Sequence, residues 1–190
     1  PFYCLMRSNA MSDEMARLLS DAGCRSIGMS VECGDERIRN EVLKRGLTNE
    51  TVIRSFQNAH KHGLKTYGNT LLAIPGTTLE DDYASLFFTK KLRMTVPSFC
   101  VFNPYPKLAL TERAIELGIL DRNLLGKRQQ VGDLSPLNCY SKAEKHQQLA
   151  LSYLGPVLCD LPSFFDRFVK PLCRLRLLMS LYRLVGNGYM

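Results

Sequence analysis

The chain has 190 residues, 45% of them hydrophobic and 23% charged, a composition that supports a folded core and excludes disordered and fibrous proteins. Its 25 Lys and Arg against 18 Asp and Glu give a net charge of +7, which is too diffuse to identify a partner, and we predict no nucleic-acid partner. Seven cysteines without a CxxC or CxxxCxxC spacing argue against a secreted disulfide framework, and no apolar run reaches the roughly 20 residues of a spanning helix. We therefore expect a cytoplasmic protein. Because the sequence opens inside an apolar run without Met, we also expect it to be part of a longer chain.

The first half of the chain alternates between strand-like and helix-like hydrophobic periods, and Gly, Pro or a capping residue marks each change. Residues 2–6 form the first predicted strand, after which Ser12 caps a helix that Gly23 ends. A second strand is predicted at 27–31. The polar run that follows it opens a helical stretch that ends at Gly46.

The same alternation continues through two more strands. Thr48 caps the next predicted helix, and the third strand covers residues 64–74. Thr78, with Asp81 three residues later, predicts a capping box and a further helix. The fourth strand is predicted at 98–102.

Strands separated by helices of about 12 to 15 residues pair in parallel through right-handed crossovers, so the fold class is α/β. Four strands cannot close an eight-stranded barrel, and we expect residues 1–120 to form part of a (β/α) barrel. Residues 121–190 are expected to be a helical extension. It begins with a polar loop and continues in helices at 142–154 and 164–185, the second broken at Pro171.

In a parallel α/β fold the ligand binds at the carboxyl ends of the strands, which makes the residues after each strand the candidates for a site. Arg7 follows the first strand, and Ser30 and Glu32 lie at the end of the second. A carboxylate there can accept hydrogen bonds from ribose hydroxyls or an amino group, and an arginine can hold a carboxylate. The alternative is that Arg7 and Glu32 pair with each other or cap helices. Residue types alone leave both readings open.

The third strand ends in Ile74, Pro75 and Gly76, a run that can approach a ligand closely or can simply end the strand. The three histidines have no metal-ligand spacing, so no metal ligands are predicted. The sequence also has no Gly-x-Ser-x-Gly, Walker or GxGxxG motif, which excludes the commonest hydrolase, NTPase and dinucleotide sites.

The order of several short motifs is more specific than any one of them. The motifs are Ala22-Gly23-Cys24-Arg25, Ser30 to Ile38, Lys44 to Thr48, His62 to Thr66, Ala73 to Asp81, and Tyr105-Pro106. In this order they resemble the later half of the radical S-adenosylmethionine (SAM) superfamily, in particular the subgroup with an amino-terminal cobalamin-binding domain. The resemblance covers residues 1–120 and, more loosely, the end of the helical tail.

This resemblance implies an enzyme in which a 4Fe–4S cluster reduces SAM to a 5′-deoxyadenosyl radical, used for hydrogen abstraction or cobalamin-dependent methyl transfer. By position, Glu32 and Ser30 would contact the ribose and methionine of SAM, and Arg7 would lie at the polar end of the preceding strand. The run from Ile74 to Gly76 would pack near the adenine. All six residues are thus candidate cofactor-binding residues, whereas the substrate is not identified.

The sequence departs from the family pattern at two points. Thr77 stands where a glutamate is expected after Pro-Gly, and the CxxxCxxC loop that holds the cluster is not in this sequence. We therefore expect the chain to be inactive by itself. Two alternatives remain open, namely another α/β barrel fragment that acts on a phosphorylated or carboxylated small molecule, and a membrane-associated or partner-binding module.

The second alternative depends on the tail. Its apolar residues recur at intervals of three and four, and basic residues lie on a neighbouring face. The apolar residues are Phe165, Phe168, Leu172, Leu175, Met179 and Tyr182. Such a stripe either packs on its own domain or makes a peripheral membrane contact through residues 164–185.

Overall fold

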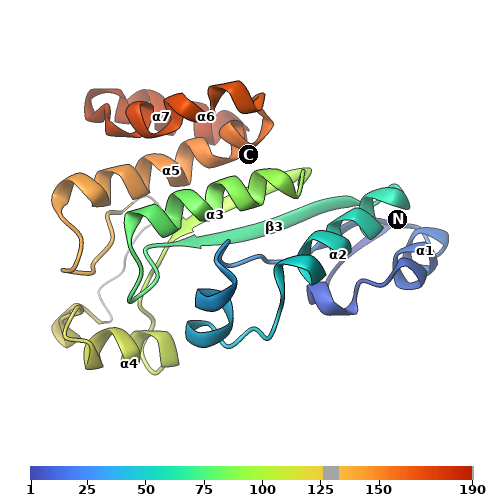
Figure 1. Cartoon of the computed structure of the whole chain (residues 1–190), viewed down its shortest axis with the longest axis horizontal. Coiled ribbons are helices and arrows are strands. Elements are labelled where there is room, and N and C mark those ends of the chain that lie inside the picture. The colour runs from blue at the N-terminus through green and yellow to red at the C-terminus, as the bar shows by residue number, and fades with distance from the viewer. Residues whose placement is uncertain (126–132, 190) are drawn as a thin grey trace.

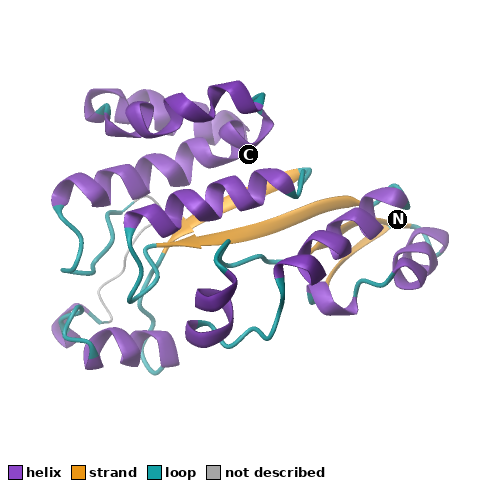
Figure 2. Cartoon of the chain, in the orientation of Figure 1, coloured by secondary structure: helices purple, strands orange, loops and turns teal. Residues whose placement is uncertain are grey.

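The computed structural model describes residues 1–125 and 133–189 and places four parallel strands in one sheet (Figures 1 and 2). Their order in the sheet is their order in the chain, which puts right-handed crossovers on one face. The strands are β1 (Phe2–Leu5), β2 (Cys24–Gly28), β3 (Lys65–Leu72) and β4 (Val96–Val101). The predicted α/β class with parallel strands is confirmed.

Seven α-helices lie within the described residues. They are α1 (Asp13–Asp21), α2 (Asn49–Lys61), α3 (Leu79–Lys91), α4 (Ala109–Glu116), α5 (Lys142–Asp160), α6 (Asp166–Arg174) and α7 (Met179–Tyr189). The shorter helical turns are Ser8–Ala10, Ile38–Val42, Arg122–Leu124, Ser163–Phe165 and Arg176–Leu178.

The predicted helix starts are confirmed by their capping geometry. Ser12 and Thr48 each accept a hydrogen bond from a backbone N–H three residues later, at 3.1 Å. Thr78 and Asp81 form the predicted capping box at the start of α3, since each side chain accepts from the other residue's backbone.

Each strand ends before its predicted position, β1 and β4 by one residue and β2 and β3 by more. The second strand ends at Gly28, and beyond it Glu32 makes an isolated parallel bridge to Thr70. The third strand ends at Leu72 because Ala73 adopts a φ of 56°. The helical stretch predicted up to Gly46 is only the short turn Ile38–Val42.

One face of the sheet is covered by helices, and the other is more open. Along β3 the side chains at 66, 70 and 72 are buried, whereas Tyr67 between them is exposed. Tyr3 and Leu5 of β1 are exposed as well. Helix α3 comes so near the segment after β2 that a Cβ on Gly34 would lie 2.7 Å from the Cα of Ser85.

The helical tail forms further layers on the helix-covered side, as Figure 1 shows. Helix α5 packs on α3 and β4, and Gly155 permits this because a Cβ there would meet the ring of Phe99 at 2.3 Å. Helices α6 and α7 lie outside α5. The division of the sequence at residue 120 stays a prediction. No helix of the described residues is long and apolar enough to cross a membrane.

The predicted break in the tail is misplaced. Pro171 lies inside α6, and the interruption comes four residues later, where Leu175 leaves helical geometry before the turn Arg176–Leu178. A proline inside a helix removes one backbone donor and commonly kinks or breaks the helix, but α6 continues through Pro171 to Arg174. Val169 and Cys173 on either side of Pro171 are both buried.

We predict that Gly34→Ala lowers the free energy of unfolding by about 1–3 kcal/mol, because the added methyl group meets the backbone of α3. Gly28→Ala is the matched control, since its Cβ would meet only the mobile end of the exposed Leu5 side chain. Urea unfolding of both variants measures the difference. Equal losses would show that the contact between Gly34 and α3 is not tight.

Candidate functional site

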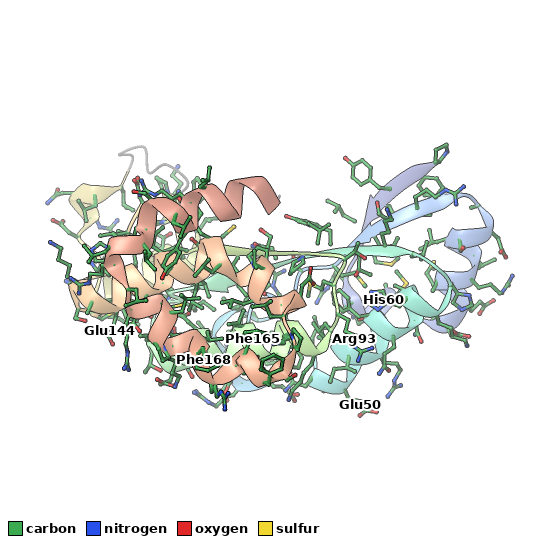
Figure 3. All side chains as sticks on the ribbon, turned by 90° about the horizontal axis from the view of Figure 1, so that it is seen from above. Glu50, His60, Arg93, Glu144, Phe165 and Phe168 are labelled. Carbon is green, nitrogen blue, oxygen red and sulfur yellow. The ribbon has the colours of Figure 1, made fainter. Side chains whose placement is uncertain are left out.

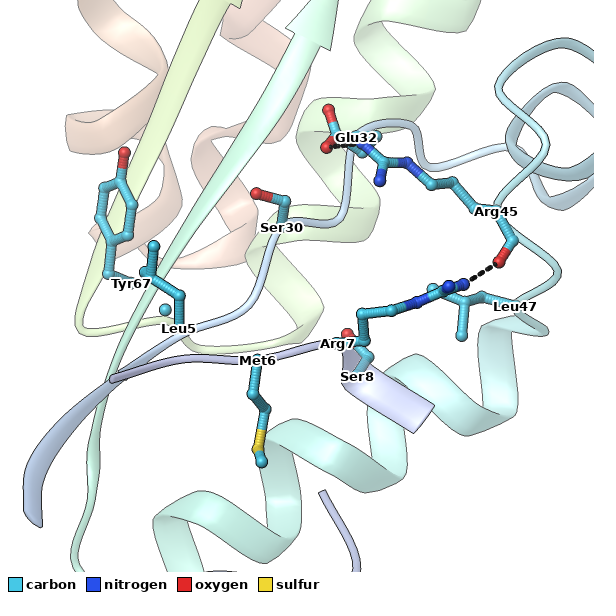
Figure 4. A pocket seen from close by; sticks show the side chains of 10 residues that line it. Leu5, Met6, Arg7, Ser8, Ser30, Glu32, Arg45, Leu47 and Tyr67 are labelled. Atoms are coloured by element: carbon cyan, nitrogen blue, oxygen red, sulfur yellow. Dashed lines mark hydrogen bonds and ion pairs between the residues drawn. The ribbon is translucent and has the colours of Figure 1, made fainter. Parts of the chain in front are cut away.

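A cavity of about 340 Å³ lies at the carboxyl ends of β1 and β2 (Figure 4). Its walls combine apolar side chains with two arginines, two serines and one carboxylate. The lining residues are Leu5, Met6, Arg7, Ser8, Gly28, Ser30, Glu32, Arg45, Leu47 and Tyr67. The structure thus brings together three of the sequence-predicted residues, namely Arg7, Ser30 and Glu32.

Glu32 is fixed by its backbone in an uncommon conformation. Its φ is 64°, a value that few residues other than glycine adopt. The backbone is nevertheless bound on both sides, because its N–H donates to Asn69 O at 3.0 Å and its carbonyl accepts from Leu71 N at 2.8 Å. The glutamate is therefore held rigidly beside β3, at the end of the sheet where ligands bind in α/β folds.

The carboxylate of Glu32 forms an ion pair with Arg45, and Arg7 donates from Nη2 to the backbone carbonyl of Arg45 at 2.7 Å. Figure 4 shows both contacts on one wall of the cavity. Only 16% of the Glu32 side chain is exposed. Burial raises the pKa of Glu32, and the nearby Arg45 opposes that rise. The alternative in which Arg7 and Glu32 pair with each other is wrong, because Arg45 is the partner of both.

A buried arginine holds the loop that carries Arg45. Arg39 is 0% exposed, and its guanidinium donates to Cys33 O at 2.7 and 2.9 Å and to Leu47 O at 3.2 Å. It also donates to Asn49 Oδ1 at 2.8 Å. One planar group with five donors thus ties the segment after Glu32 to the start of α2.

Neighbouring contacts fix the same loop along its length. Asn40 and Leu47 exchange two hydrogen bonds, at 2.8 Å and 3.1 Å. The backbone N–H of Arg45 donates to Arg39 O at 3.1 Å, and Asn49 N donates to Glu36 Oε2 at 2.6 Å. Arg45 therefore projects toward Glu32 from a loop that is hydrogen-bonded at both ends.

Sequence reasoning missed Arg39 and Arg45 as contributors to this site. Arg45 belongs to the motif Lys44 to Thr48, but its position after a helix gave no sign that the chain turns back toward Glu32. Lys44 makes that turn with a φ of 54°. A long-range contact of this kind has no local periodic signal.

The other three predicted residues lie at the end of β3 and do not line the cavity. Ile74 is buried with Cys33, and Pro75 and Gly76 follow it in a turn that Thr77 closes by donating to Ile74 O at 3.0 Å. Their assignment to SAM stays a prediction.

A buried carboxylate, that of Asp82, is hydrogen-bonded to the backbone at the start of this turn. Asp82 is 2% exposed and accepts from Ala73 N and from Gln148 Nε2, both at 2.9 Å. Burial raises the pKa of Asp82 to about 7, although both hydrogen bonds favour the charged form. Tyr140 from the segment before α5 donates nearby, to Thr77 O at 3.0 Å.

Within the described residues, no group of three or more His, Cys, Asp or Glu side chains could hold a metal ion. The seven cysteines are free, and they are distributed over separate strands, helices and loops: Cys4, Cys24, Cys33, Cys100, Cys139, Cys159 and Cys173. A 4Fe–4S cluster needs three thiolates close together. The residues of this chain therefore do not fit such a cluster.

Comparison with known proteins supports the resemblance. Residues 2–88, which include β1 to β3 and the whole wall around Glu32, match the family model of the radical SAM superfamily. The resemblance inferred from the order of the motifs is confirmed.

Two curated relatives are methyltransferases. An uncharacterized methyltransferase of Pyrococcus horikoshii is 30% identical over 114 residues, which are 60% of this chain and 25% of the relative. Cytidylyl-2-hydroxyethylphosphonate methyltransferase of Streptomyces wedmorensis is 22% identical over 117 residues, which are 58% of this chain and 22% of that protein. The chain thus spans about a quarter of the length of the curated relatives it matches.

Solved structures agree with the fold. The radical SAM methyltransferase TsrM from Kitasatospora setae, with cobalamin and a 4Fe–4S cluster bound, has a TM-score of 0.54 and 26% identity, over 77% of this chain and 28% of TsrM. Coproporphyrinogen III oxidase (HemN) from Escherichia coli, also a radical SAM enzyme, has a TM-score of 0.53 and 12% identity. That match covers 99% of this chain, including the tail, and 70% of HemN.

We predict that Arg39→Met lowers the free energy of unfolding by about 3 kcal/mol or more, since several buried acceptors lose their donor at once. The control is Arg37→Met, because Arg37 is exposed and its ion pair is with the exposed Glu41. We expect that change to stay within about 0.5 kcal/mol. Denaturant unfolding of the two variants measures this contrast, and similar losses would contradict the anchoring role of Arg39.

Asp82 predicts a specific pH dependence of stability. Because its pKa in the folded state lies above the ordinary value of 3.8, its contribution is complete below that value and is lost as the pH rises through about 7. At about 1.4 kcal/mol per pKa unit, the loss is on the order of 4 kcal/mol. The variant Asp82→Asn retains an acceptor for Ala73 N and does not titrate. Urea unfolding across this pH range should show wild type losing stability relative to the variant, whereas parallel profiles would contradict the prediction.

Proposed function

We propose that this chain is the carboxyl-terminal part of a radical SAM enzyme and that the cavity around Glu32 binds SAM in the complete protein. The observation that carries the proposal is the wall formed by Glu32, Arg45 and Arg7, which sets one carboxylate and two guanidinium groups at the end of a parallel sheet. The family match covers all of these residues. In the complete enzyme the four strands contribute part of a (β/α) barrel.

The chemistry of the cavity suits a zwitterionic nucleoside. The Glu32 carboxylate can accept hydrogen bonds from ribose hydroxyls or from the ammonium group of the methionine moiety. Arg7 and Arg45 present guanidinium groups to its carboxylate, and Ser30 adds a hydroxyl. The side chains of Leu47 and Tyr67 supply apolar walls. In this proposal Arg45 holds Glu32 in place before SAM binds and exchanges that contact for the ligand.

The reaction itself requires groups that this chain does not hold. A 4Fe–4S cluster, whose three thiolate ligands this chain does not supply, would provide the electron for the cleavage of SAM in the complete protein. The chain's own residues bind and orient SAM. The relatives are methyltransferases and favour methyl transfer, with hydrogen abstraction as the alternative outcome, and TsrM supports cobalamin as a further cofactor. We place the enzyme in the reducing cytoplasm, with its small-molecule substrate unassigned.

We predict that Glu32→Gln in the complete protein weakens SAM binding by about tenfold or more, since a charge-assisted hydrogen bond contributes about 1.5–3 kcal/mol. Glu50→Gln is the control, because Glu50 is an exposed helix residue whose ion pair is with Arg54. Isothermal titration with SAM measures both affinities. Unchanged affinity in a folded Glu32→Gln protein would remove Glu32 from the binding site.

A further inference from the structure

The outer helical segments of the tail carry a set of exposed apolar side chains, which we call the tail surface. It consists of Phe164, Phe165, Phe168, Leu175, Leu177, Leu181 and Leu184. Figure 3 looks down on this layer and shows Phe165 and Phe168 on its helices. Leu177 is 98% exposed and Leu184 is 71% exposed. Large exposed apolar patches on a protein commonly mark a contact with a partner or a membrane.

The tail does not need these side chains to pack on its own domain. A different face of α6 and α7 enters the core through Val169, Cys173 and Tyr182, all of which are buried. The Tyr182 hydroxyl donates to Leu172 O at 2.7 Å and joins the two helices. The stripe expected from the sequence is therefore divided, with Tyr182 in the core and Phe165 and Phe168 outside.

The charge around the tail surface is positive. Residues 161–184 contain five Lys and Arg and a single acidic residue, Asp166, which pairs with Lys90 of α3. One of the five, Lys170, pairs with Glu80. The other four are exposed arginines without an ion pair to a carboxylate among the described residues: Arg167, Arg174, Arg176 and Arg183. Arg167 lies over the ring of Phe168, at 4.7 Å from its centroid.

We propose that the tail surface binds an anionic lipid membrane in a peripheral manner. Aromatic and leucine side chains would enter the boundary between head groups and acyl chains, while the arginines reach anionic head groups beside them. Each such basic residue near an anionic surface favours binding. The helices would lie along the surface, which agrees with the absence of a spanning helix among the described residues.

The charge pattern favours a lipid surface over a second copy of the chain. Two copies that met through this face would bring their unpaired arginines together with only Asp166 between them, and like charges in contact oppose association. An anionic membrane offers negative charge and apolar volume at the same surface. Lipid is therefore the occupant that matches both features of the tail surface.

The test is flotation of the complete protein with phosphatidylcholine vesicles and with vesicles that also contain phosphatidylglycerol, at low and high salt. We expect salt-sensitive flotation with the anionic vesicles only. Leu177→Ser with Leu184→Ser removes two exposed apolar side chains and should lower the partition coefficient about tenfold or more. Arg167→Gln with Arg176→Gln should lower it similarly. The matched control is Leu108→Ser with Leu117→Ser, since these exposed leucines flank α4 and should not affect flotation.

Three outcomes would overturn the proposal. The first is no flotation of a chain that circular dichroism shows to be folded. The second is flotation that survives the loss of Leu177 and Leu184, which would indicate a simple polyanion contact. The third is a dimer in sedimentation equilibrium that the same leucine substitutions abolish, which would assign the tail surface to a second copy.

Discussion

The buried guanidinium of Arg39 is the interaction on which the candidate site depends. A cation in a protein interior is costly unless acceptors surround it, and here carbonyl oxygens on both sides of the loop and an asparagine supply them. The same contacts hold the segment after Glu32 and the start of α2 at a fixed separation. Arg45 lies on the loop between them, so its approach to Glu32 follows from the packing of Arg39 instead of from any preference of its own.

The segments that contain Glu32 and Ala73 share a structural feature. Each follows a parallel strand and contains a residue other than glycine with positive φ, Glu32 four residues after β2 and Ala73 directly after β3. Such residues keep their conformation only where surrounding contacts enforce it. For Glu32 those contacts are the backbone hydrogen bonds to β3, and for Ala73 they are the bond to Asp82. Both segments therefore leave the sheet in defined directions, one into the cavity and the other beneath the helical tail.

Local signals predicted most of the fold, and long-range contacts account for what they missed. Ser12, Thr48 and Thr78 are capping residues whose geometry depends on the next three residues, so the sequence alone located them. The fold class followed from the alternation of strands and helices, and the family from the order of the motifs. The Glu32–Arg45 pair depends on a turn at Lys44 and a buried arginine, which no period in the sequence reveals. The break in the tail was misplaced because tertiary packing of Val169 and Cys173 overrode the effect of Pro171.

The central claim is that the wall formed by Glu32, Arg45 and Arg7 binds SAM in the complete protein. A crystal structure of that protein with its cluster reconstituted and SAM bound tests it most directly. We expect a ribose hydroxyl or the ammonium group of SAM within hydrogen-bond distance of the Glu32 carboxylate, with Arg45 turned from Glu32 toward the ligand. SAM bound elsewhere, with the Glu32–Arg45 ion pair intact, would contradict the claim.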